Sequence, residues 1–253
     1  MFRKVMLPGM ILALAVPLVM HADTATAPVE LTAAQIAEKN ATARGGLSAW
    51  RGVKTMTLSG TLEAGGDQNV QLPVVLEMKR PRKTRVELKF EGQTAVQVYD
   101  GTNGWKLRPF LNRHEVEPFN TDEKQAASMQ ADLDGPLMDY ASKGTKLELE
   151  GTEPVEGKPA YNLKLTLKSG QTQHVWVDAA SFLDVKVEGT PRRLDGKYRP
   201  VQIYLRNYKA ENGLMVPHVL ETVVEGAKRS ERIRIDRVLV NPKLEDSQFS
   251  KPQ

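Results

Sequence analysis

The sequence predicts a mainly β protein in which a long antiparallel sheet curls toward a barrel. From Thr55 onward apolar and polar residues alternate with a period of two, which is typical of strands buried on one face. Short turn segments separate these runs, at Gly151, Gly157, Ser169-Gly170 and Asn212-Gly213. Because strands joined by such short turns pair antiparallel, we expect ten to twelve strands in meander order.

The first 22 residues have the layout of a secretory signal peptide. Arg3 and Lys4 form a basic start, residues 5–20 are almost wholly apolar, and small residues follow from Ala22. The apolar run falls short of the ~20 residues that a membrane-spanning helix needs. We therefore expect export with cleavage near Ala22, and a single domain over residues 23–253.

A helical segment is expected before the first strand. Thr32 and Gln35 have the spacing of a capping box, and the pair Gly45-Gly46 is expected to break the helix. Between and beyond these positions apolar residues recur at helical intervals, at Ile36, Ala43, Leu47 and Trp50.

The expected strands follow in two groups. Met56, Leu58 and Leu62 alternate with polar residues in the first strand, and Val86 and Leu88 do so in a later one. The same alternation returns after residue 145, in Leu147 and Leu149, Leu163 and Leu165, Val175 and Val177, Val185 and Val187, Ile203 and Leu205, and Ile233 and Ile235.

The segment from Asn120 to Gly144 interrupts the β pattern and predicts two short helices. Asn120 or Thr121 is a candidate cap for the first helix, and Pro136 suits the first position of the second. The apolar residues of the pair are Ala126, Met129, Leu133, Leu137, Met138 and Tyr140. Composition alone leaves open whether these helices cover one end of a solid core or form a lid over a pocket.

Charge and composition exclude several functions. Loss of residues 1–22 removes two of the 35 basic residues and none of the 31 acidic ones, which leaves a net charge of +2. A chain so close to neutral, without a basic stripe, is not expected to bind nucleic acid. The sequence contains no cysteine, so disulfides, thiol nucleophiles and the acylated cysteine of a bacterial lipoprotein are absent.

The sequence also lacks the signatures of the common enzyme classes. It contains no Gly-x-Ser-x-Gly elbow, no Walker-type loop and no His-Glu-x-x-His. Beyond the signal peptide, His114, His174 and His218 are scattered singly among the expected strands and loops. We therefore predict no enzymatic activity, no metal site and no cofactor.

Two motifs carry a resemblance to a known family. Met78-Lys79-Arg80-Pro81 is followed, after an alternating strand, by Tyr99-Asp100-Gly101-Thr102-Asn103-Gly104-Trp105. This arrangement resembles the periplasmic lipoprotein-carrier (LolA-like) family, in which Lys-Arg-Pro precedes Asp-Gly-x-x-x-Trp. The resemblance implies a curved, incompletely closed antiparallel β-barrel, or half-barrel, with helices forming a lid. It also implies a monomeric periplasmic carrier that takes acyl chains of lipoproteins or other lipids from an inner-membrane donor to an outer-membrane acceptor.

Arg80 has two interpretations. The residues alone favour a solvated hairpin turn whose charges discourage pairing of sheet edges. The resemblance instead implies a latch, in which the guanidinium of Arg80 donates hydrogen bonds to backbone carbonyls of the lid helices and releases them when ligand enters. Arginine suits this role because it presents five donors in a rigid fork.

If the protein is a carrier, apolar residues on the inner face of the sheet and on the lid should line its cavity. The candidates from the sheet are Met56, Leu58, Val75, Val86, Leu88, Val96, Val98 and Trp105, and those from the lid are Met129, Leu133, Leu137 and Met138. Which strand face points inward is a choice of parity. The alternative function is a non-enzymatic sensing or regulatory module of the cell envelope that docks on a partner protein.

Overall fold

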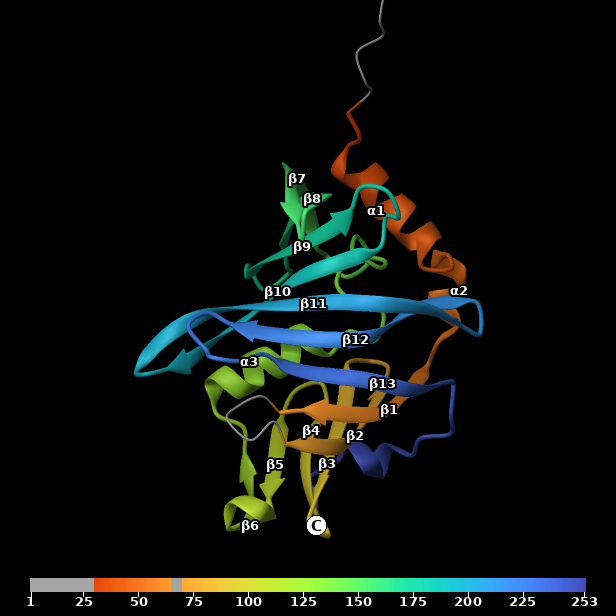
Figure 1. Ribbon diagram of the computed structural model, residues 1–253. Helices are drawn as coiled ribbons and strands as arrows, with labels where there is room; N and C mark the ends of the chain where they lie inside the picture. Colours follow the sequence, from red (N-terminus) through yellow and green to blue (C-terminus); the bar gives the residue numbers. More distant parts are fainter. Residues whose placement is uncertain (1–29, 65–69) are drawn as a thin grey trace, which may run out of the picture. The chain divides into compact units, whose positions relative to one another are not determined.

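A single sheet of thirteen strands dominates the computed structural model, which describes residues 30–64 and 70–253 (Figure 1). The expected signal peptide, residues 1–22, lies outside the described residues. The helices are α1 (Ala33–Ala43), α2 (Leu47–Gly52) and α3 (Thr121–Gln130), with short 3-10 helices at Pro109–Leu111 (η1) and Asp246–Phe249 (η2). The strands are β1 (Thr55–Glu63), β2 (Gln71–Lys79), β3 (Lys83–Phe90), β4 (Gln93–Tyr99), β5 (Gly104–Arg108), β6 (Arg113–Pro118), β7 (Lys146–Val155), β8 (Lys158–Thr166), β9 (Thr172–Asp178), β10 (Asp184–Leu194), β11 (Lys197–Glu211), β12 (Leu214–Val224) and β13 (Glu231–Val240).

The strand order confirms an antiparallel sheet that does not close into a barrel. From one edge to the other it is β6-β5-β4-β3-β2-β1-β13-β12-β11-β10-β9-β8-β7. The chain therefore starts in the middle of the sheet, runs out to the β6 edge, crosses to the β7 edge and returns. The expected meander order of ten to twelve strands is correct within β1–β6 and within β7–β13 but wrong between these groups. β6 and β7 lie at opposite edges, and the two groups join where β1 pairs with β13.

The crossing between the two edges is made by α3 and the turns that follow it. α3 contacts β4 and β5 on one side and β10 on the other. In Figure 1 this helix lies at the level of β12 and β13, between β10 above and β5 below. The segment that interrupts the β pattern in the sequence is thus the one that connects the two edges of the sheet.

The segment after α3 differs from the prediction. The capping box of Asn120 and Glu123 starts α3 as expected, but residues 131–145 form turns and bends in place of a second helix. Gly135 has φ +80°, Asp139 φ +54° and Gly144 φ +73°, and such left-handed residues cannot continue a right-handed helix.

The start of the structured chain agrees with the sequence. Thr32 and Gln35 form the capping box of α1, and the helix ends before Gly45 and Gly46. Gly45 has φ +107°, and a Cβ placed there would lie 2.3 Å from the carbonyl oxygen of Gly213. Only glycine therefore lets the α1–α2 corner approach the β11–β12 turn so closely.

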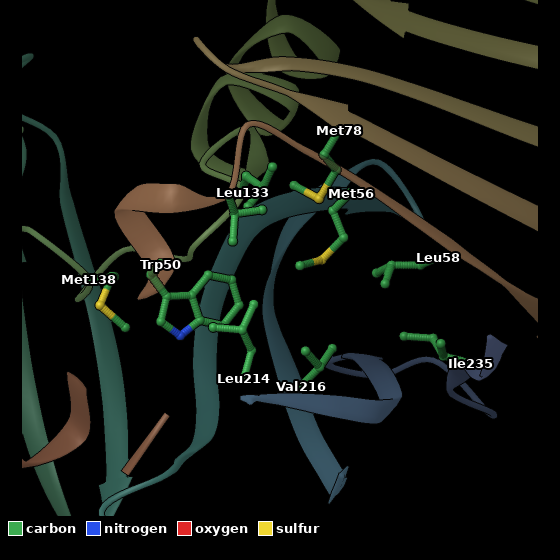
Figure 2. Packing of buried hydrophobic residues seen from close by; sticks show 10 residues of the cluster. Trp50, Met56, Leu58, Met78, Leu133, Met138, Leu214, Val216 and Ile235 are labelled. Carbon is green, nitrogen blue, oxygen red and sulfur yellow. The ribbon is translucent and has the colours of Figure 1, made fainter. Parts of the chain in front are cut away.

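Buried apolar residues form two main clusters within the unit Leu31–Gln253. Figure 2 shows the first, in which the Trp50 ring stands among Leu133, Leu214 and Val216. The second packs Ile36 of α1 and Leu137 against Leu163, Leu165, Val175 and Val177 of β8 and β9. Across residues 30–64 and 70–253, no helix is both long and apolar enough to cross a membrane.

Candidate functional site: an apolar pocket under α3

A pocket of about 680 Å³ lies between the sheet and α3. Both halves of the sheet contribute to its wall, and α3 with the turn after it covers the pocket. The apolar residues of β1 to β3 at the pocket are Met56, Leu58, Leu62, Val74, Leu76, Met78, Val86 and Leu88. Those of β10 to β13 are Val187, Val201, Ile203, Leu205, Val216, Leu220, Ile233 and Ile235. The cover adds Ala126, Ala127, Met129, Leu133 and Pro136.

The register of the strands explains why these residues share one face. Leu76 of β2 lies opposite Leu58 of β1 and opposite Val86 of β3. Val74 likewise lies opposite Leu88. Because residues directly opposite each other in an antiparallel pair point to the same side, the apolar residues of three strands form one continuous wall.

Seven of the twelve residues that the sequence suggested for a cavity border this pocket: Met56, Leu58, Val86, Leu88, Val98, Met129 and Leu133. Two of these, Met129 and Leu133, come from the cover and the others from the sheet. The structure therefore brings the two predicted groups together around one space.

Val75, Val96 and Trp105 are placed elsewhere, because the parity chosen for their strands was wrong. Val75 lies between Val74 and Leu76, which both border the pocket, so its side chain points to the opposite face. Val96 and Trp105 pack on that face around Phe249 of η2. The side chain of Val98 belongs to the same cluster, although the residue borders the pocket between Gln97 and Tyr99.

Leu137 and Met138 are also outside the pocket wall. Leu137 is 2% exposed and packs into the cluster of β8 and β9, and Met138 is fully buried in the cluster around Trp50. The turn at Gly135 and Pro136 takes the chain away from the pocket before these residues. They therefore hold the segment after α3 to the two main buried clusters.

The residues that sequence reasoning missed belong mostly to β10 to β13. Ile203 and Leu205 on β11, and Ile233 and Ile235 on β13, carry the expected alternation and complete the wall. The alternation identified these residues as strand positions. It gave no sign that β13 returns beside β1 and brings them to the same space as Met56.

Arg80 connects three segments at one end of the pocket cover. Its Nε donates to the carbonyl oxygen of Val53 at 2.8 Å, and its Nη2 donates to the carbonyl oxygen of Trp50 at 3.2 Å. The same Nη2 donates to the carboxylate of Asp134 at 2.7 Å. The carbonyl bonds thus go to α2 and the residue after it, whereas the segment after α3 is reached through a carboxylate.

Asp134 is the centre of this connection. Its side chain is only 2% exposed and also accepts a hydrogen bond from Nζ of Lys143 at 2.7 Å. Nearby, Arg82 donates to the carbonyl oxygen of Ser128 near the end of α3 and lies 3.4 Å from the carboxylate of Asp132. Two arginines of the β2–β3 turn therefore hold the C-terminal end of the cover.

The N-terminal end of α3 is held by two other contacts. Nζ of Lys106 on β5 donates to both carboxylate oxygens of Glu123 at 2.5 Å. The hydroxyl of Tyr198, in the β10–β11 hairpin, donates to the carboxylate of Asp122 at 2.7 Å. α3 is thus fastened by polar contacts at both ends, and none of its own residues is buried.

No family model matches the sequence, and no curated protein matches it. Solved structures do match. A LolA superfamily protein from Nitrosomonas europaea aligns at a TM-score of 0.59 and 15% identity, over 88% of this chain and 99% of that one. A putative outer membrane lipoprotein-sorting protein domain from Vibrio parahaemolyticus aligns at a TM-score of 0.57 and 15% identity, over 85% and 95%.

A third match is a DUF1329 family protein from Desulfovibrio piger, at a TM-score of 0.58 and 14% identity, over 87% of this chain and 98% of that one. Each of these proteins is spanned almost completely by the match. The motifs at residues 78–105, the open antiparallel sheet and these likenesses agree. The chain therefore has a LolA-like fold.

Proposed function

We propose that this protein is a periplasmic carrier that binds acyl chains of lipoproteins or other lipids in the pocket under α3. The observation that carries the proposal is the pocket of about 680 Å³, walled by apolar side chains from both halves of the sheet. Its volume lies within the roughly 300–1,000 Å³ that is usual for ligand sites. The putative lipoprotein-sorting domain among the structural matches supports the same class of cargo.

An apolar wall supplies the affinity that a carrier needs. Each methylene group transferred from water to such a wall contributes about 0.8 kcal/mol, so a single acyl chain binds without any strong polar contact. The layout of residues 1–22 supports export, and the periplasm is the aqueous space that such a chain has to cross. Donor and acceptor proteins at the inner and outer membranes would load and unload the carrier.

We assign Arg80 as the latch of this carrier. Three hydrogen bonds join it to α2, to the residue after it and to the cover segment. Displacement of the segment around Asp134 breaks the charged bond and leaves the two carbonyl bonds in place. The cover can therefore move relative to α2 while the β2–β3 turn stays attached to α2. The acyl chain is then transferred because the acceptor binds it more tightly than the carrier does.

The binding proposal is tested by titrating delipidated protein with the fluorescent probe N-phenyl-1-naphthylamine and displacing it with dodecanoate. We expect saturable binding at one probe per protein and displacement by the fatty acid. Val86→Trp should weaken binding at least tenfold, because the indole occupies the pocket. Val75→Trp is the matched control, since Val75 is also half-buried but points to the opposite face.

The same titration can contradict the proposal. If the probe does not bind, or if Val86→Trp and Val75→Trp change binding equally, the pocket does not receive ligand. A docking module with a filled interior would then be the better account of this chain.

The latch is tested separately, by transfer of a loaded acyl chain to acceptor vesicles. Arg80→Leu should change the transfer rate by an order of magnitude or more while the probe still binds. Arg80→Lys keeps the positive charge but loses the planar guanidinium with its several donors, so an intermediate transfer rate is expected. Arg51→Leu removes another arginine that pairs with the cover segment, at Asp139, and serves as the control. Equal transfer rates in wild type and Arg80→Leu would contradict the latch.

A further inference from the structure

Two buried charged side chains border the pocket near Trp50 of α2. Arg44 and Asp184 are each only 5% exposed. Tyr208 also borders the pocket, and its hydroxyl donates to the carbonyl oxygen of Asp184 at 2.9 Å. Charged groups are costly to bury beside an apolar wall, so their presence there needs a reason.

The guanidinium of Arg44 has more donors than the described residues use. Its Nη1 donates to the carbonyl oxygen of Asp134 at 2.7 Å and to the carboxylate of Asp184 at 3.3 Å. Its Nε is buried and finds no hydrogen-bond partner among the described residues. The side chain keeps 7% of its surface exposed and borders the pocket, and no described residue accepts a hydrogen bond from its Nη2. An acceptor oxygen of a ligand can therefore meet the guanidinium at this end of the pocket.

The charge of Arg44 is already largely balanced. The Asp184 carboxylate lies next to it and is held in place by Nδ2 of Asn40 at 2.9 Å. Burial raises the pKa of Asp184 and Arg44 opposes that rise, so the two groups depend on each other. A balanced pair accepts a neutral carbonyl or a single negative charge more readily than a doubly charged phosphate.

The position of this group suits the head of a long chain. Asp184 opens β10, and Arg193 near the other end of the same strand also borders the pocket. At about 3.3 Å per residue, these two ends of the pocket are roughly 25–30 Å apart. Apolar residues of β11, Ile203 and Leu205, lie between them along the wall.

We propose that Arg44 forms a head-group site, which binds the carbonyl or carboxylate oxygen of an acyl chain whose methylene groups lie along the apolar wall. The inference rests on the proposed carrier function and adds the part of the ligand that the pocket recognises.

The test compares ligands of equal chain length that differ only in the head. Dodecanoate, methyl dodecanoate and dodecane are used to displace N-phenyl-1-naphthylamine from the delipidated protein. In Arg44→Met we expect the affinity of both oxygen-bearing chains to fall roughly ten- to a hundredfold relative to dodecane, the range for a hydrogen bond to a charged group. Arg51→Met is the control, because Arg51 pairs with Asp139 outside the pocket wall and should leave the ratios unchanged.

A second variant decides the question even if Arg44→Met does not fold. Asp184→Asn keeps the size of the side chain and removes the charge that balances Arg44. It should raise the affinity for dodecanoate relative to methyl dodecanoate several-fold. In wild type, tighter binding of dodecanoate than of its ester indicates a free carboxylate as the natural head, and equal binding indicates the carbonyl of an ester or amide.

The outcomes separate this inference from the proposal beneath it. If the probe binds to wild type but the ligand ratios stay the same in every variant that folds, the head-group site is overturned and the carrier stands. If the probe does not bind to wild type at all, the carrier function itself fails, and the head-group site with it.

Discussion

The two sides of the interior, built from the same alternating strands, are used in opposite ways. Beneath α1, the side chains of Leu163, Leu165, Val175 and Val177 are fully buried and packed against Ile36. Beneath α3, residues such as Val86, Ile203 and Leu205 have the same pattern, but they remain half-buried around a pocket. The strands decide which face is apolar, and the covering helix decides whether that face is filled.

The two covering helices differ in what they insert. α1 places Ile36 directly into the core, where it is completely buried. α3 presents Ala126, Ala127 and Met129 at the pocket, none of which is buried, and holds its position through polar contacts at Asp122 and Glu123. A helix that is held at its ends and inserts no buried side chain leaves space beneath it.

The largest expected effect compares truncations in the two regions. Leu165→Ala removes a fully buried side chain from the packed cluster and should lower the free energy of unfolding by about 2–5 kcal/mol, because a new cavity forms. Leu205→Ala on the pocket wall should cost about 1 kcal/mol, since the space beside it is already open. Denaturant unfolding measures both values. Equal losses would show that the pocket side is packed like the other.

The sequence predicts some elements of this structure better than others. Period-two alternation identified the strands, and the cap at Thr32 and the break at Gly45-Gly46 were predicted in place. These features depend on neighbours in the chain, which is why local patterns are sufficient for them.

Other features depend on contacts between distant segments. β4 has apolar residues at both parities, Ala95 and Tyr99 on one face and Val96 and Val98 on the other. The two valines suggested the pocket, but η2 covers them with Phe249. The pairing of β1 with β13 and the absence of a second cover helix were equally invisible to local patterns, because tertiary packing decides them.

An effect of intermediate size on the free energy of unfolding is expected when a ligand binds. Dodecanoate at a hundred times its dissociation constant should raise the free energy of unfolding by about 2.7 kcal/mol. Leu165→Ala should gain the same increment as wild type, because its site lies in the packed cluster and not at the pocket. Val86→Trp should gain little. Thermal unfolding with and without dodecanoate measures all three, and equal gains in Val86→Trp and wild type would place the ligand outside the pocket.

The smallest expected effect concerns the attachment of the cover segment to α2. The guanidinium of Arg51 donates two hydrogen bonds of 2.8 Å to the carboxylate of Asp139 and lowers the pKa of that carboxyl to about 2. The ionised form therefore stabilises the fold above about pH 4, and this contribution disappears as the pH falls toward 2. Because the Arg51 side chain is 57% exposed, screening reduces the contribution to about 1 kcal/mol.

Asp139→Asn tests this attachment without disturbing the backbone, since asparagine also tolerates the left-handed φ of +54°. We expect wild type to exceed the variant in unfolding free energy by about 1 kcal/mol at pH 7, with the difference shrinking as the pH is lowered from 4 to 2. Asp195→Asn, at a similar φ of +49°, gives the baseline for the amide substitution. A difference that does not change with pH would assign the effect to packing and not to charge.

Native mass spectrometry of the protein purified from its producing cells tests the central claim most directly. The account predicts a species carrying one acylated molecule, which organic extraction releases and which Val86→Trp strongly reduces while Val75→Trp retains it. The account is contradicted if wild-type protein is found only at the mass of the ligand-free chain and does not take up added dodecanoate. In that case the pocket under α3 does not hold an acyl chain.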